Sequence, residues 1–229
     1  MGNGVEKLLL LVAGRPVVWH AWALFEGMSQ IHEVVLVVRE GMQDFFLKLA
    51  RESDFRKPFS FAIGGRERQD SVWSGLEALS PRSRWVAIQD GARPCTTPAT
   101  VLATLAAAHR TGAAVAGQRI TDTVKEEDGR GQVARTLDRS RLWSVQTPQA
   151  FRIEVIRRAL AEVRLRGLPV TDDTAACEAI GEPVELVESP DPNPKVTVPA
   201  DLAVVELLLR HRAAAAGREG AATMPSDGE

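Results

Sequence analysis

Short runs rich in apolar residues alternate along the chain with longer segments in which apolar residues recur at helical spacing. The run at 34–38, Val-Val-Leu-Val-Val, is β-branched, continuous and too short for a typical helix. Such a run is typical of a parallel strand buried on both faces. The predicted strands are residues 34–38, 59–63, 85–88, 113–116 and 184–187.

Helical spacing predicts helices between and after these strands. They include a stretch with Phe45, Phe46 and Leu49, followed by residues 69–79, 98–109, 153–166, 174–180 and 199–212. Because strand and helix alternate, we expect right-handed βαβ crossovers and a doubly wound, mostly parallel α/β sheet of Rossmann-like type.

The pattern changes between residues 119 and 149, where short segments of mixed polarity flank a turn at 129–131. This pattern predicts an antiparallel β-arm. An isolated hairpin is marginally stable in water, so we expect the arm to pack on another surface, most simply in a homodimer. Residues 1–212 then form one domain that includes the arm, and residues 213–229 form a flexible tail.

Composition narrows the class of protein. The 229 residues are 45% hydrophobic, enough for one sizeable core. A net charge of -2 argues against a partner such as nucleic acid or an anionic membrane. Cys95 and Cys177 form no CxxC pair, and we expect a reducing, cytoplasmic setting without a secretory leader. No apolar run approaches the roughly 18 to 20 residues of a membrane span.

In open α/β sheets the ligand crevice lies beyond the carboxyl ends of the strands. The first loop there contains Gly64 and Gly65, which let backbone approach a ligand, followed by a helix start whose N–H groups can hold polar or anionic atoms. The alternative is an ordinary strand-to-helix turn with Asp70 or Ser71 as the helix cap.

Two further loops carry charge. Asp90 follows a predicted strand, and Arg93 comes three residues later. Arginine can bind phosphate bidentately, and the carboxylate can hold a metal-bound or hydroxylated ligand, so Asp90 is also the candidate metal ligand. The alternative is a solvated ion pair in a turn. Lys195 follows Pro192 and Pro194, which restrict its neighbours, although an isolated lysine is usually a surface residue.

Several motifs occur in order along residues 2 to 209: G-x-x-K-L-L-L-x-x-x-G-x-P-V, GGRERQDSV, DGARP, DTVK, LDRSRLWSVQTPQAF, TDDTAA and PNPKVTVPADL. Together they closely resemble the 2-C-methyl-D-erythritol 4-phosphate cytidylyltransferases of non-mevalonate isoprenoid biosynthesis, within the nucleotidyltransferase superfamily. Ribitol 5-phosphate cytidylyltransferases share most of the motifs, but TDDTAA and the TPQAF context look more like the methylerythritol group.

The resemblance implies that Lys7 holds the CTP phosphates. It implies that Gly64, Gly65 and Ser71 are nucleotide-binding positions near the cytosine. Arg66 stands where some relatives have an acidic residue, so base recognition is expected to rest more on backbone groups than on this side chain.

Asp90, Arg93 and Lys195 match the pocket for methylerythritol phosphate. Thr123 and Arg139 match arm residues that reach the substrate phosphate across a dimer interface. The implied reaction transfers CMP from CTP, with Mg²⁺ on the triphosphate and release of pyrophosphate. A phosphate is already a nucleophile at neutral pH, so positioning and cationic stabilisation, with Lys7 and Lys195 as the catalytic lysines, are expected to suffice.

One part of the family pattern is missing. The family opens with a buried strand and an A-A-G-x-G-x-R-M-G loop, whereas this chain starts at Met1-Gly2, which matches only the end of that loop. We therefore expect an absent first strand and an unpaired edge on strand 34–38 or its neighbour. We favour a start assigned at an internal methionine. The alternative is a truncated, inactive nucleotide-binding module.

Overall fold

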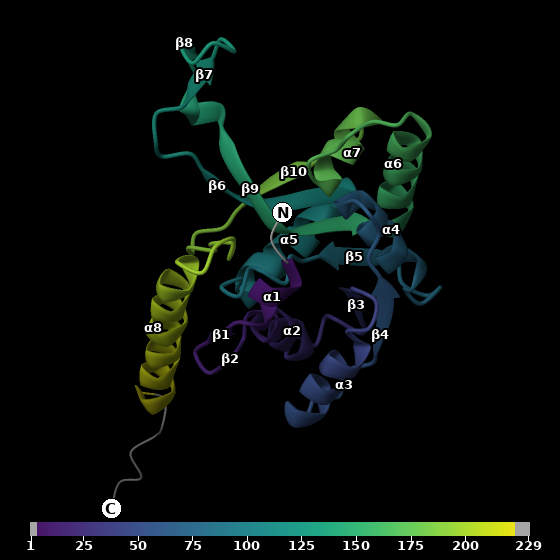
Figure 1. The fold of residues 1–229 in the computed structure, drawn as a ribbon, viewed down its shortest axis with the longest axis vertical. Helices are drawn as coiled ribbons and strands as arrows, with labels where there is room; N and C mark the ends of the chain where they lie inside the picture. Colours follow the sequence, from purple (N-terminus) through teal and green to yellow (C-terminus); the bar gives the residue numbers. More distant parts are fainter. Residues whose placement is uncertain (1–3, 223–229) are drawn as a thin grey trace, which may run out of the picture.

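The apolar runs that the sequence marks as strands form the sheets of the fold. The computed structural model describes residues 4–222. The fold is α/β and Rossmann-like, as predicted, with a β-arm that projects from the body (Figure 1). The strands that match predicted runs are β3 (Val34–Val38), β4 (Phe59–Ile63), β5 (Trp85–Ile88), β6 (Ala113–Arg119) and β10 (Glu185–Glu188).

The main strands form two sheets. One is four-stranded, in the order β10-β6-β9-β5, and the other is the pair β3-β4. β3 with β4, and β6 with β10, are parallel pairs. β9 (Trp143–Arg152) is the antiparallel exception, because it runs opposite to both β5 and β6. The sequence did not reveal this central strand, whose residues 146–151 are buried.

Alternation along the strands explains how helices cover both faces of the larger sheet. Ala113 and Phe151 point to the face covered by α6 (Ile153–Leu165). Their neighbours Ala114 and Ala150 point to the other face, where they pack on the alanines of α5 (Pro98–Thr111). The small side chains of β6 allow both helices to approach closely, which confirms the doubly wound arrangement.

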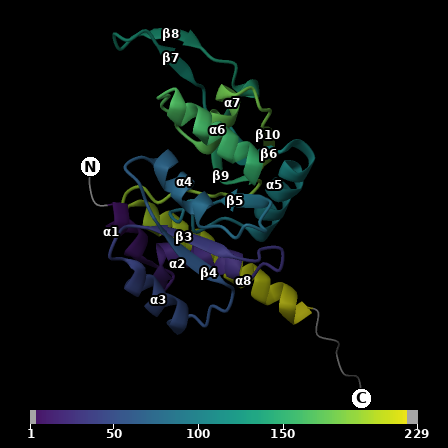
Figure 2. The same cartoon turned by 90° about the vertical axis from the view of Figure 1, so that its right-hand side faces the viewer.

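β3 and β5 do not pair with each other. Within the described residues β3 pairs only with β4, and β5 pairs only with β9, so each keeps an unpaired edge. The expected unpaired edge at 34–38 is therefore confirmed. Val34 and Ala87 both pack on the cluster around Phe25, Met28 and Val101, which joins the two sheets through side chains instead. Figure 2 shows the sheets one above the other.

The β-arm is shorter than predicted at its carboxyl end. It contains β7 (Lys125–Glu127), β8 (Val133–Thr136) and the short helix η1 (Arg139–Arg141). Every residue of β7 and β8 is exposed, so the arm has no core of its own, as expected. The predicted boundary at residue 149 is wrong, because β9 has already entered the central sheet there and Gln149 is buried.

The last helix is longer than predicted. α8 (Asp201–Ala222) continues past the expected end at Arg212, so residues 213–222 of the predicted tail are helical. The alanines at 213–216 favour this, because alanine has the highest helix propensity. The rest of the tail, 223–229, lies outside the described residues. The remaining elements are α1 (Gly4–Leu9), β1 (Leu11–Val12), β2 (Arg15–Pro16), α2 (Val17–Glu26), α3 (Gln43–Glu52), α4 (Arg68–Glu77) and α7 (Asp173–Ala179).

Among the helices of residues 4–222, none combines the length and the apolar character that crossing a membrane requires.

Both cysteines are free and fully buried. Burial raises the pKa of both thiols, that of Cys177 to about 12. Because the thiolate is the reactive form, we expect a thiol-reactive dye at about pH 8 to label neither Cys95 nor Cys177 in the native protein. Both should be labelled once guanidinium unfolds the chain, as mass spectrometry would count. Rapid labelling of native protein would contradict their burial.

Candidate active site

Three charged side chains from two loops meet at the carboxyl end of β5. The Asp90 Oδ2 atom lies 2.7 Å from Lys195 Nζ and 3.8 Å from Arg93 Nε. The side chains of Asp90 and Arg93 are only 20% and 13% exposed, so the alternative of a solvated surface pair is wrong. Lys195 is 41% exposed but paired, unlike an isolated surface lysine. We call these residues the Asp90 cluster.

A buried asparagine joins the loops of the Asp90 cluster. The backbone carbonyl of Asn193 accepts a hydrogen bond of 2.7 Å from Arg93 Nη1. Its side chain accepts from Thr96 Oγ1 at 3.1 Å and donates to the Thr147 carbonyl at 3.1 Å. The Thr147 hydroxyl in turn accepts from the backbone N–H of Asp90. Asn193 is 2% exposed, so it fixes three segments at one point.

Sequence reasoning did not identify Asn193, Thr96 or Thr147 as site residues. The available signal was Pro192-Asn193-Pro194, a polar residue between two prolines that fix its backbone. The Thr147-Pro148 bond, within β9, is cis. Neither feature shows from sequence alone which partners these residues meet.

Val196, which precedes α8, and Arg212, within α8, also hold the loops. The Val196 N–H donates to the Ala92 carbonyl at 2.8 Å, directly after Lys195. Arg212 donates to the carbonyls of Cys95 and Pro192, one from each loop. Backbone and side chain therefore fasten the Lys195 loop to the Asp90 loop.

The Asp90 cluster carries one more positive than negative charge, since two cations face one carboxylate. Burial lowers the pKa of Arg93, and the charge of Asp90 opposes that effect. Guanidinium groups stay protonated at neutral pH even so. An excess cation among partly buried side chains suits an anionic ligand such as a phosphate.

The Gly-Gly loop, residues 64–71, follows β4 and leads into α4. The Gly65 N–H donates to Ser71 Oγ at 3.1 Å, so two predicted nucleotide-binding residues contact each other. A Cβ on Gly65 would lie 2.2 Å from Asp70 Cβ, so only glycine fits there. The helix cap is Glu67, with Asp70 accepting from the Glu67 N–H, which differs from the cap at Asp70 or Ser71 weighed above.

Lys7 lies in α1, and the next residue, Leu8, packs beside Gly91 of the Asp90 loop. Hydrogen bonds from the Val198 and Thr197 N–H groups lower the pKa of Asp201 at the start of α8, and the charge of Lys7 adds to this effect. The structure therefore brings α1 to the loops of the Asp90 cluster, although no ion pair joins Lys7 to Asp90 among those recorded for residues 4–222.

Thr123 and Arg139 lie on the β-arm and are not part of the Asp90 cluster of their own chain. Arg139 donates to the Thr121 carbonyl, and η1 presents it at the exposed base of the arm. A role for these two residues therefore depends on what the arm contacts.

The fold and the charged loops at the ends of its strands define a nucleotidyltransferase. The family model for IspD, 2-C-methyl-D-erythritol 4-phosphate cytidylyltransferase, matches residues 1–211. The chain belongs to this family.

Individual relatives agree with the family match. The chain is 41% identical over 213 residues to the 2-C-methyl-D-erythritol 4-phosphate cytidylyltransferase of Pelotomaculum thermopropionicum, covering 93% of this chain and 90% of the relative. It is similar to the crystal structure of 4-diphosphocytidyl-2C-methyl-D-erythritol synthase from Anaerococcus prevotii, with a TM-score of 0.83, 28% identity and coverage of 89% and 93%. The Thermus thermophilus structure of a 2-C-methyl-D-erythritol 4-phosphate cytidylyltransferase gives a TM-score of 0.74, 33% identity and coverage of 91% and 96%.

Replacing Asn193 tests its role in joining the loops. Asn193→Ala removes the partners of the Thr147 carbonyl and the Thr96 hydroxyl, so we expect a loss of about 1–3 kcal/mol in the free energy of unfolding. Urea denaturation measures it. Gln132→Ala, which shortens an exposed amide on the arm, serves as the control and should change stability little. Equal stabilities of the two variants would show that Asn193 does not hold the loops.

Proposed function

We propose that the protein transfers CMP from CTP to 2-C-methyl-D-erythritol 4-phosphate, giving 4-diphosphocytidyl-2-C-methyl-D-erythritol and pyrophosphate. The observation that carries this proposal is the Asp90 cluster. Its net positive charge suits a phosphate, and its carboxylate suits a hydroxylated ligand. Ribitol 5-phosphate is the second candidate acceptor, because it offers the same two chemical features.

In this proposal the protein supplies positioning and charge. Arg93 and Lys195 hold the acceptor phosphate while one of its oxygens attacks the α-phosphorus of CTP and the bond to pyrophosphate breaks. The cations stabilise the charge that builds on the transferred phosphoryl group. Lys7 takes the departing phosphates, and the Gly-Gly loop receives the cytosine through Gly64, Gly65 and Ser71. No side chain has to be activated as a nucleophile.

A magnesium ion would come with CTP. The described residues contain no group of three or more Asp, Glu, His or Cys side chains that could hold a metal. Magnesium in phosphoryl-transfer sites needs only one or two carboxylates besides the phosphates, and Asp90 is the carboxylate that fits this part. When bound, the ion would neutralise charge on the triphosphate.

We also propose a homodimer in which the β-arm covers the partner's site. The arm has no core, and Val133 is 64% exposed at its tip, so a second surface would stabilise it. Thr123 and Arg139 would then reach the acceptor phosphate of the neighbouring subunit. The two free thiols support the further proposal of a cytoplasmic location.

Pyrophosphate release tests the reaction and the acceptor together. We expect release with CTP and methylerythritol phosphate, and less with ribitol 5-phosphate. Lys195→Ala should lower the rate about a hundredfold to a thousandfold, because it removes a preorganised cation. Lys48→Ala, which removes a lysine that is 71% exposed on α3, is the matched control and should stay near the parent rate.

Three results would contradict this proposal. Binding of CTP with no turnover of either acceptor would favour a nucleotide-binding module. Faster turnover of ribitol 5-phosphate would reassign the acceptor. A parental rate in Lys195→Ala would remove Lys195 from the site.

Mixing variants tests the shared site. Arg139→Ala and Lys195→Ala lie in different parts of the proposed composite site, so each alone should be inactive. In mixed dimers one site would combine an intact Arg139 with an intact Lys195, and part of the activity should return. Exchange of subunits, followed by mass spectrometry of differently tagged chains, is the control. Confirmed exchange without recovery would exclude action across the dimer.

A further inference from the structure

The Gly-Gly loop and the Asp90 cluster belong to different sheets. The Gly-Gly loop follows β4, whereas Asp90 follows β5, and no strand of one sheet pairs with a strand of the other within residues 4–222. Backbone hydrogen bonds between strands therefore do not fix the distance between the two loops. Side-chain packing sets this distance instead. The cluster around Phe25 joins β3 to β5, and α4 contacts β3 and β4 on one side and α6 on the other (Figure 2).

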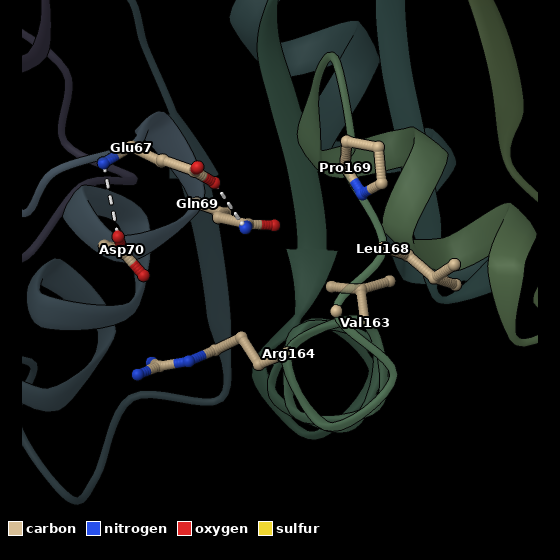
Figure 3. Close-up of a pocket in the computed structure, with 8 residues that line it drawn as sticks. Glu67, Gln69, Asp70, Val163, Arg164, Leu168 and Pro169 are labelled. Carbon is tan, nitrogen blue, oxygen red and sulfur yellow. Dashed lines mark hydrogen bonds between the residues drawn. The ribbon is translucent and has the colours of Figure 1, made fainter.

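The two ends of α4 are held unequally. Its carboxyl half packs into the core through Leu76, which is 2% exposed, and Arg157 donates to the Leu76 carbonyl. The first turn instead borders a cavity of about 320 Å³. Figure 3 shows the polar side chains of the first turn facing α6 and the loop after it. The cavity is lined by Glu67, Gln69, Asp70, Val163, Arg164, Gly167, Leu168 and Pro169.

One ion pair ties this first turn to the larger sheet. Arg68 Nη1, in the first residue of α4, lies 2.7 Å from Asp173 Oδ1 in α7. The Asp173 side chain is 1% exposed, and its Oδ2 atom is buried without a hydrogen-bond partner in the described part of the chain. Burial raises the pKa of Asp173, and the Arg68 hydrogen bond opposes this. Without Arg68 both carboxylate oxygens would be buried and unpaired.

Asp173 is the fixed end of the pair. Its N–H donates to Gln149 Oε1 at 3.1 Å, and Gln149 Nε2 donates to Asp172 at 2.8 Å. Asp172 caps α7 by accepting from the Ala175 N–H. Gln149 lies in β9, two residues after Thr147, which holds the Asp90 N–H. Polar contacts and a short stretch of β9 backbone, from Gln149 to Thr147, therefore link the first turn of α4 to the Asp90 cluster.

We propose that Arg68 and Asp173 are positioning residues that hold the Gly-Gly loop at a set distance from the Asp90 cluster. Because the Gly-Gly loop is the proposed cytosine site, this inference rests on the proposed function for its effect on catalysis. Arg68 would act through the Gly-Gly loop, so its replacement should weaken the binding of CTP more than the binding of the acceptor. Within residues 4–222 neither Arg68 nor Asp173 forms an ion pair with a residue of the Asp90 cluster.

The test compares Arg68→Gln, Asp173→Asn and the double variant with Arg164→Gln. Arg164, in α6, is the matched control. Its guanidinium lies 5.0 Å from the ring of Trp73, which is on α4 like Arg68, but it does not reach Asp173. Hydrogen exchange at residues 64–71 reports the loop without any substrate, and KM is measured separately for CTP and for methylerythritol phosphate. The double variant removes both charges, so it folds without a buried unpaired carboxylate even if Arg68→Gln alone does not.

We expect exchange at residues 64–71 to become about tenfold faster in Arg68→Gln, Asp173→Asn and the double variant. The KM for CTP should rise about tenfold, with the KM for the acceptor within about twofold of the parent. Arg164→Gln should change none of these. Parental exchange in the folded variants, or equal rises in both KM values, would overturn the proposal. A parent protein that releases no pyrophosphate would reject the proposed function alone, since the exchange result still decides whether the pair holds the loop.

Discussion

The site depends on one buried amide. Asn193 is the point where the Asp90 loop, β9 at Thr147 and the approach to Lys195 meet. Each segment presents backbone or side-chain polar groups there, so none could be buried against the others unless those groups were paired. The side-chain amide of Asn193 supplies one donor and one acceptor, and the backbone carbonyl of Asn193 supplies a second acceptor. Together with the Val196 N–H and Arg212, Asn193 therefore holds the loops of the Asp90 cluster in place.

The position of the nucleotide half of the site has a different physical basis. Its loop belongs to the β3-β4 pair, which joins the larger sheet through the side chains around Phe25 and through α4, not through a continuous ladder. Side-chain contacts are individually weaker constraints than a paired strand. The ion pair between Arg68 and the buried Asp173 therefore has a large effect for a single contact, because it spans the junction directly.

Elements with a regular apolar pattern could be predicted from the sequence, whereas features that depend on individual residues could not. Strands 34–38, 59–63 and 85–88 were predictable, because short runs rich in apolar residues are typical of buried strands. The charged residues after them marked the site. β9 was missed because Pro148 and the glutamines beside it look like a loop, although Gln146 and Gln149 are buried and each donates to another side chain. The end of α8 was missed because small residues read as a tail. Asn193 could not be found, since its partners lie 46 and 97 residues away along the chain.

The central claim is that a phosphate oxygen of the acceptor attacks CTP while the Asp90 cluster holds it. Labelling the phosphate of methylerythritol phosphate with ¹⁸O tests this most directly, with phosphorus NMR of the products. We predict that ¹⁸O appears in the bridge between the two phosphorus atoms of the product and that the released pyrophosphate carries none. An unlabelled bridge, or hydrolysis of CTP to CMP alone, would contradict the claim.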